Sequence, residues 1–268
     1  METGLENNFS NKPTCLSGFM NHAFDSEATL AYTLFLLWGS ERLVVLVKNN
    51  EQMLAGEQYD LSEQPGMPFL KQLFSGSELL NQVYKEVNLF MCQSDHVSLP
   101  LNWLEVSEEE SMLIHASGDK ERVVKHYFDS KNKHVFGVPP VLHKLISQSY
   151  KHVNWLPATA CLPNDLWDTF DVIAVVWKHK CLLFKHTGRS HQLHWSAYDH
   201  EKSLLYAVLS LIEIEGLNEQ EVRVGLIADE TEPLIKTLQP YVANCLSLAA
   251  TEDSPFFTFL NELSLAHH

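Results

Sequence analysis

Two stretches of this chain, one beginning near Leu30 and one near Val172, have the same expected order of secondary-structure elements. In each stretch, three short apolar runs separated by turn residues predict a β-meander, and an amphipathic helix and a further apolar strand follow. The two units lie too far apart in the chain for a solenoid repeat. The sequence therefore predicts an α/β chain in which a β-β-β-α-β unit occurs twice, and a single sandwich-like α+β domain is the alternative.

The expected elements of both units follow from apolar periodicity and turn residues. The first unit has expected strands at 30–38, 43–48, 52–59 and 87–91 and an expected helix at 69–84. The second unit has expected strands at 172–177, 180–187, 192–196, 222–227 and 245–248 and expected helices at 199–216, 232–239 and 255–265. Between the units, Pro139 or Pro140 is expected to start a helix that runs to Tyr150.

Composition restricts the classes of partner. Hydrophobic residues make up 45% and charged residues 20%, which is typical of a globular protein. The net charge of −15 repels a phosphate backbone, and the sequence has no basic patch to offset it. We therefore expect no nucleic-acid partner.

The cysteines and the apolar stretches indicate the compartment. Five scattered cysteines without a C-x-x-C pair are typical of reduced thiols, not of a disulfide framework. The N-terminus has no signal-peptide pattern, and the longest apolar stretch, 28–38, is about half of what a membrane helix needs. We expect a cytoplasmic protein that has no membrane segment.

Three segments carry a resemblance to a known family: the VFGVP strand-to-helix step at 135–139, the meander at 172–196, and the helix at 198–216 with the segment 217–224 after it. With the order of elements, they resemble the bacterial family known as domain of unknown function 3822, whose members show an actin-like ATPase fold. That superfamily, which includes sugar kinases, chaperone ATPases and actin, consists of two ribonuclease-H-like halves. The resemblance covers roughly residues 29–265. It implies a first ribonuclease-H-like lobe at 29–165 and a second at 166–268, and the mostly polar stretch before them predicts a flexible tail at 1–28.

The resemblance also implies a nucleotide site from which this sequence departs. Active members place an Asp at the end of each first strand and then a glycine-rich turn, whose N–H groups hold phosphate oxygens. Here the turn at 37–42 has one Gly and no Asp before it, and the turn at 176–180 has neither residue. Asp171 lies at the wrong end of its strand, and the segment 226–231 replaces the Gly-Gly step expected near the adenosine. These departures argue against ATP hydrolysis.

The two turns distinguish a nucleotide-binding cleft from a closed one. Gly39 and Ser40, or Lys178 and Lys180, would have to line an open cleft for a nucleotide to bind. A bulky Trp38 or Trp177 in that space would exclude it. Other Trp side chains are expected in or beside strands, mostly in the core, and one exposed at a sheet edge would suit a protein partner: Trp155, Trp167 and Trp195.

Histidine is unusually frequent, with 14 His against 11 Gly. Five of these histidines fall close together: His179, His186, His191, His194 and His200. Across a hairpin turn at Gly188-Arg189, His186 and His191 would face each other, where two imidazoles can share a metal. No further ligand completes such a site, so solvent-exposed histidines are the favoured interpretation.

Acidic and serine motifs give similarly weak signals. Asp165, Asp168 and Asp171 could hold Mg²⁺, but helix capping and solvation are favoured. The S-x-x-K matches at 117–120 and 130–133 lack the companion motifs of a serine acyltransferase. We therefore assign no catalytic residue, no metal site and no cofactor. The sequence favours a non-enzymatic module that binds another protein or itself, and the alternative is an actin-like ATPase with unusual phosphate loops.

Overall fold

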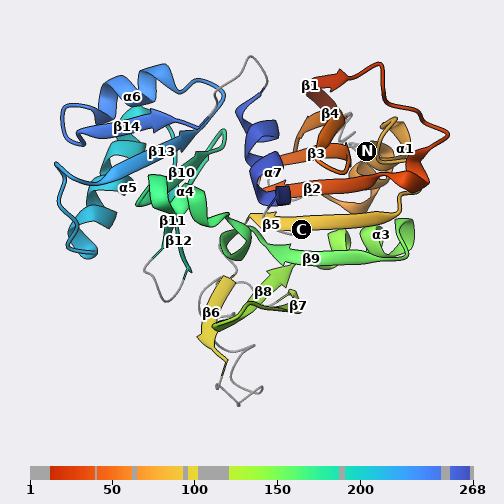
Figure 1. Cartoon of the computed structure of the whole chain (residues 1–268), viewed down its shortest axis with the longest axis horizontal. Helices are drawn as coiled ribbons and strands as arrows, with labels where there is room; N and C mark the ends of the chain where they lie inside the picture. The colour runs from red at the N-terminus through yellow and green to blue at the C-terminus, as the bar shows by residue number, and fades with distance from the viewer. Residues whose placement is uncertain are drawn as a thin grey trace, which may run out of the picture.

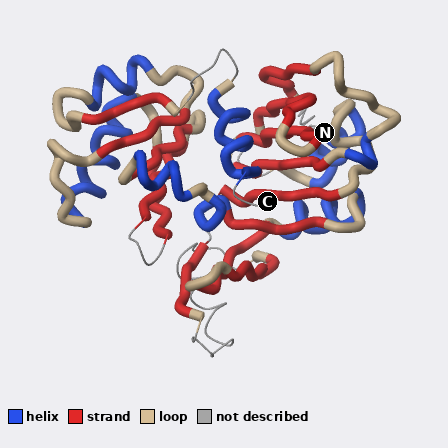
Figure 2. Tube along the Cα trace, in the orientation of Figure 1, coloured by secondary structure: helices blue, strands red, loops and turns tan. Residues whose placement is uncertain are grey.

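The computed structural model describes residues 13–39, 41–61, 65–92, 96–101, 121–186, 191–248 and 254–265. Their strands form a six-stranded, a five-stranded and a three-stranded sheet, which we call the first, second and third sheet (Figure 1). Figure 2 shows helices on the outer faces of the two larger sheets and more helix between them.

The first sheet has six strands in the order β1-β4-β3-β2-β5-β9. Its strands are β1 (Thr14–Met20), β2 (Thr33–Gly39), β3 (Arg42–Asn49), β4 (Gln52–Asp60), β5 (Glu86–Cys92) and β9 (Val153–Pro157). β2 pairs antiparallel with β3 and parallel with β5. Almost every residue of β2 and β3 is buried, because both faces of the sheet are covered and the strands are nearly continuous runs of Leu, Val and Phe.

The second sheet has five strands in the order β12-β11-β10-β13-β14. Its strands are β10 (Val172–Val176), β11 (Lys180–His186), β12 (His191–Ala197), β13 (Arg223–Ile227) and β14 (Asn244–Ser247). The first three strands form an antiparallel meander, and β13 and β14 add in parallel beside β10. β4-β3-β2-β5-β9 of the first sheet has the same order and directions, so the predicted duplication is confirmed.

The third sheet lies apart from this duplicated frame. It has the order β6-β8-β7 and consists of β6 (His96–Pro100), β7 (Val123–Phe128) and β8 (Asn132–Val138). It is inserted between β5 and helix α3 (Pro140–Ser149), and all its neighbouring strands are antiparallel. The expected helix start at Pro139 or Pro140 is confirmed.

The remaining helices cover the sheets. They are α1 (Met67–Gly76), α4 (Asn164–Thr169), α5 (Glu201–Ile214), α6 (Glu232–Leu238) and α7 (Pro255–Leu265), with short 3₁₀ turns η1 (Thr29–Ala31) and η2 (Ala158–Cys161). α1 and α3 pack on the outer face of the first sheet, and α5 and α6 pack on the outer face of the second. None of the described helices is both long and apolar enough to span a membrane.

The helices on the outer faces cover one hydrophobic core on each of the two larger sheets, which we call the outer cores. A further hydrophobic core, which we call the central core, lies between the inner faces of these two sheets. Side chains of β2 and β3 enter it from one side, those of β10 and β11 enter from the other, and α7 lies between them (Figure 1). Phe256 on α7 is fully buried and stacks on Trp177, with 4.8 Å between the ring centroids. One apolar helix therefore joins the two sheets.

Two expectations differ from the structure. The sequence predicts a flexible tail at 1–28, but residues 14–20 form β1, which pairs with β4. Gly56 of β4 admits the ring of Phe19, which meets Phe257 of α7 edge to face at 5.1 Å. The helix expected at 69–84 ends at Gly76, because the Ser77 hydroxyl accepts hydrogen bonds from the amides of Leu79 and Leu80 and turns the chain.

The central core yields a stability prediction. We expect Phe256→Ala to lower the free energy of unfolding by about 3–5 kcal/mol, because it removes a fully buried ring between two sheets. Urea unfolding measures this loss. The control is Phe128→Ala, whose side chain is 59% exposed and which we expect to cost less than about 1 kcal/mol. Equal losses in the two variants would contradict a central role for Phe256.

Candidate functional site

Three segments that would form a nucleotide site in the expected fold meet between the two larger sheets. They are the turn between β2 and β3, the turn between β10 and β11, and the segment after β13. We call them the first turn (39–42), the second turn (177–180) and the β13 exit (228–230). The first turn contacts both the second turn and the β13 exit, and we call the junction of the three segments the closed cleft.

An indole ring fills the closest approach of the two turns. Trp177 is 2% exposed, and a Cβ built on Gly39 would lie 2.7 Å from its ring. Only a residue without a side chain allows this approach, because no real Cβ atom tolerates such a distance. Trp38 is also buried, but it packs in the outer core with α1 and α3. Trp177, not Trp38, therefore fills the space between the first turn and the second turn.

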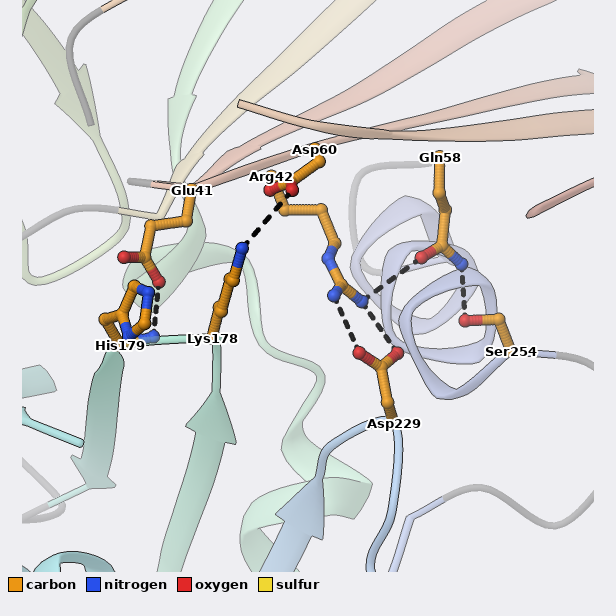
Figure 3. A network of polar contacts seen from close by, with 8 residues as sticks. All are labelled: Glu41, Arg42, Gln58, Asp60, Lys178, His179, Asp229 and Ser254. Carbon is orange, nitrogen blue, oxygen red and sulfur yellow. Dashed lines mark hydrogen bonds and ion pairs between the residues drawn. The ribbon is translucent and has the colours of Figure 1, made fainter. Parts of the chain in front are cut away.

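An ion pair joins the first turn to the β13 exit. Arg42 donates two hydrogen bonds to Asp229, each 2.7 Å long, from Nη1 to Oδ1 and from Nη2 to Oδ2 (Figure 3). Its guanidinium also lies over the Phe256 ring, with Cζ 4.4 Å from the centroid. A planar guanidinium makes two-point contacts with a carboxylate and stacks on an aromatic ring, which an ammonium group cannot do. Arg42 thus links the β13 exit to α7.

A carboxylate of the first turn accepts a hydrogen bond from the second turn. The backbone N–H of His179 donates to Oε2 of Glu41 over 2.7 Å (Figure 3). Backbone N–H groups of this turn are the kind that the resemblance expects to hold a phosphate. Glu41 is 4% exposed, so its side chain supplies an internal anion at this amide. Lys178 also approaches Asp60, with Nζ 3.8 Å from Oδ2, but both side chains are well exposed and the pair adds little.

Two buried polar atoms of the closed cleft lack a hydrogen-bond partner within the described ranges. They are Oε1 of Glu41 and the indole N–H of Trp177. An unpaired buried polar group costs about 1–3 kcal/mol. Apolar packing around Phe256 must therefore offset an unfavourable polar contribution where the turns meet.

The structure does not bring the predicted histidine cluster together as one site. His186 and His191 are paired across the β11–β12 hairpin, as predicted, but their side chains lie outside the described residues. His200 accepts a hydrogen bond from the amide of Ser203 at the start of α5. His194 is half-buried, and His179 contributes its backbone to the closed cleft. The described ranges contain no group of three or more His, Cys, Asp and Glu residues that could hold a metal ion.

The three predicted aspartates have separate structural roles. Asp165 lies in the first turn of α4. Asp171 accepts hydrogen bonds from the backbone and side chain of Arg223, and the Asp168 carbonyl accepts another from the same guanidinium. Burial raises the pKa of Asp171, but the contacts with Arg223 outweigh that effect and lower it. The sequence favours helix capping and solvation for these residues, but no described side chain caps α4, and Asp171 is instead held by Arg223.

The remaining predicted features divide between core and surface. Trp167 is buried, Trp155 is half-buried, and Trp195 is 59% exposed on the edge strand β12. Ser40 and the S-x-x-K match at 117–120 lie outside the described residues. The second S-x-x-K match places Ser130 in an exposed turn and Lys133 near the Phe128 ring.

Sequence reasoning missed the partners that close the cleft. Arg42 and Asp229 are 187 residues apart in the chain, so no local motif joins them. The available signal was an Asp in place of the expected Gly-Gly step. It becomes informative only when the fold places that Asp beside the first turn.

Comparisons with known proteins agree with this fold. The sequence matches the family described as protein of unknown function (DUF3822) over residues 21–245, and the search of curated proteins gives no match. A Bacteroides thetaiotaomicron protein with actin-like ATPase fold and unknown function has a TM-score of 0.74 at 14% identity, covering 88% of this chain and 98% of that one. The PilM-PilN type IV pilus biogenesis complex gives a TM-score of 0.56 at 11% identity, with 87% and 97% coverage. The cytoplasmic domain of EpsL from Vibrio cholerae, an inner membrane component of the type II secretion system, gives 0.50 at 15% identity, with 88% and 96% coverage.

The contact between Gly39 and Trp177 can be tested by a double-mutant cycle. We expect Gly39→Ala to destabilise the protein by about 1–3 kcal/mol, because its Cβ would overlap a ring that is held by Phe256. In a Trp177→Ala background the same substitution should cost almost nothing, since the overlap is gone. Chemical unfolding of the four proteins measures both effects.

Gly76→Ala is the matched control, because a Cβ at Gly76 meets nothing within 4 Å. It should leave the stability within about 0.5 kcal/mol of the parent. A Gly39→Ala cost that persists without the Trp177 ring would contradict the proposed overlap.

Proposed function

Since the chain belongs to the DUF3822 family and has an actin-like ATPase fold, we propose that it is a protein-binding or scaffold module whose former nucleotide cleft serves as a structural joint. The observation that carries this proposal is the closed cleft. The Trp177 ring lies against Gly39, and the Glu41 carboxylate accepts the hydrogen bond that the backbone N–H of His179 donates. Both contacts use space or donors that a nucleotide phosphate would need.

The charge of the closed cleft supports the same conclusion. Glu41, Asp60 and Asp229 bring three carboxylates to the junction. Arg42 and Lys178 are already engaged by two of them, and the remaining charges of the described turn residues, Lys180 and Glu230, are opposite in sign. A triphosphate would have to break the Arg42–Asp229 pair and approach the other two carboxylates. ATP binding through unusual phosphate loops, the alternative, therefore requires the two sheets to separate.

Fold neighbours support a binding role. PilM is recorded in a complex with PilN, and EpsL is a component of a secretion system. We extend to this chain the general role of recognising a partner protein or a second copy of itself.

We also propose the lobe division at 165/166, which keeps the five duplicated strands of each sheet in one lobe. We further propose a cytoplasmic location, which five free cysteines, four of them buried, support.

The nucleotide alternative is tested by thermal unfolding with and without 5 mM Mg·ATP, a proposed condition. A ligand at about 100 times its Kd adds about 2.7 kcal/mol to native stability, which is a shift of several degrees. We expect no shift. A clear rise in Tm that Glu41→Gln increases would overturn the closed-cleft interpretation, because neutralising Glu41 removes the internal anion.

The binding role is tested at Trp195, whose side chain is 59% exposed on an edge strand. Light scattering reports self-association, and affinity capture from an extract of the source organism reports other partners. We expect Trp195→Ala to weaken the interaction at least tenfold, because Trp is the side chain most enriched among binding hot spots.

Tyr206→Ala is the control for that measurement, since Tyr206 is an aromatic residue on α5 with 68% exposure. It should retain the interaction. Absence of both self-association and a specific partner, together with a shift in Tm by Mg·ATP, would contradict the proposed function.

A further inference from the structure

Four polar side chains form a continuous chain of hydrogen bonds from the third sheet to η2. Oγ1 of Thr159 lies 3.1 Å from Nδ1 of His96, and Nε2 of His96 lies 3.0 Å from Nδ1 of His134. Nε2 of His134 lies 2.7 Å from Oδ2 of Asp129. Thr159 belongs to η2, and the other three residues belong to the third sheet or its turn, so this chain is a direct polar link between the two.

Strand register brings the two rings together. His96 on β6 is opposite Phe136 of β8, and His134 lies two residues earlier on β8. Residues two apart on a strand share a face, so the two histidines are diagonal neighbours on one face of the third sheet. Their ring planes differ by 15°, and the 5.2 Å between centroids is close to the N···N distance plus the two ring radii. The imidazoles therefore lie almost end to end.

The direction of each hydrogen bond follows from Asp129. Burial raises the pKa of this carboxyl, but hydrogen bonds from His134 and from the amides of Lys131 and Asn132 outweigh it and lower the pKa to about 2. Asp129 is thus an acceptor at any ordinary pH, and Nε2 of His134 must carry a proton. In a neutral ring Nδ1 of His134 then accepts from His96, and Nδ1 of neutral His96 accepts from the Thr159 hydroxyl.

Added protons have unequal effects on this chain. A first proton on Nδ1 of His96 preserves all the contacts, because the Thr159 hydroxyl can turn from donor to acceptor. A second proton on Nδ1 of His134 places two hydrogens between the rings and two positive charges side by side. The 3.0 Å contact cannot survive that change. Asp129 can balance one positive charge on the fully buried His134 but not a second one on the neighbouring His96.

Few other groups at this link change charge near neutral pH. Among the described residues, Tyr127 of β7 lies 5.9 Å from the His134 ring, and Cys161 of η2 lies near Tyr127. Burial raises the pKa of both groups to about 12, so both stay neutral. Strand β12 passes beside β6 and η2. Its uncharged side chains Leu193 and Trp195 lie on the face of the second sheet that is turned to β6 and η2. His194 lies on the opposite face, which α5 covers, because it is opposite Leu183 in the strand register.

We propose that His96 and His134 form a proton-controlled latch: the pair holds the third sheet on η2 while it carries at most one added proton, and a second proton releases the sheet. Histidine is the side chain that most readily gains a proton between neutral and mildly acidic pH, so acidification is the signal to test. His96 is half-buried and gives protons a route to the pair. The latch does not depend on whether the closed cleft can bind a nucleotide.

Hydrogen–deuterium exchange at pH 7.5 and 5.5, corrected for intrinsic rates, tests the latch in the full chain. Amides of β6 and β8 should exchange at least fivefold faster at the lower pH, and amides of β10 and β13 should not change. His134→Gln should abolish the difference, because a Gln amide can donate to Asp129 and accept from His96 but cannot take up the second proton. His96→Gln repeats the test from the other ring if the buried substitution prevents folding.

His152→Gln is the matched control, because His152 is exposed before β9 and should leave the pH response intact. The latch is wrong if β6 and β8 exchange equally at both pH values in the parent protein, or if both Gln variants keep the response. Faster exchange in β10 and β13 at pH 5.5 would also overturn it, since general loosening would then explain the effect.

Discussion

The contact between the Trp177 indole and the bare backbone of Gly39 determines how the two halves of this fold meet. It sets the distance between the first turn and the second turn, and Phe256 and Arg42 continue the stack on the other side of the ring. The duplicated units are therefore joined by direct packing between the first turn and the second turn.

Polar groups of the closed cleft are arranged so that the protein supplies its own counter-ions. Glu41 takes the place of an external anion at the amide of His179, and Asp229 neutralises a largely buried Arg42. Removing one member of such a pair leaves the other charge unpaired, which is usually more costly than replacing both. The departures from the nucleotide pattern thus form a connected set in three dimensions, although each looks like a separate loss in the sequence.

Local patterns predicted most of the fold, because runs of Leu and Val with Gly or Asn turns mark strands and hairpins regardless of context. They failed where tertiary contacts decide the outcome. The Ser77 hydroxyl ends α1 early, and Val83, which falls within the expected helix at 69–84, lies outside α1 and is 64% exposed. β1 was missed because its residues are mostly exposed and depend on Phe19 meeting Gly56 and Phe257. Register alone creates the His96–His134 pair, so no spacing rule could have found it.

The position of α7 in the chain has a consequence for synthesis on the ribosome. The inner faces of both larger sheets bury their apolar side chains against this helix, which follows every strand in sequence. Until α7 emerges, β2 and β3 expose one apolar face, and their native contacts with Phe256 and Leu260 are strongly non-local. Such contacts slow folding and leave intermediates prone to aggregation. We expect nascent chains that lack α7 to be substrates for chaperones, and the last helix to complete both halves in one step.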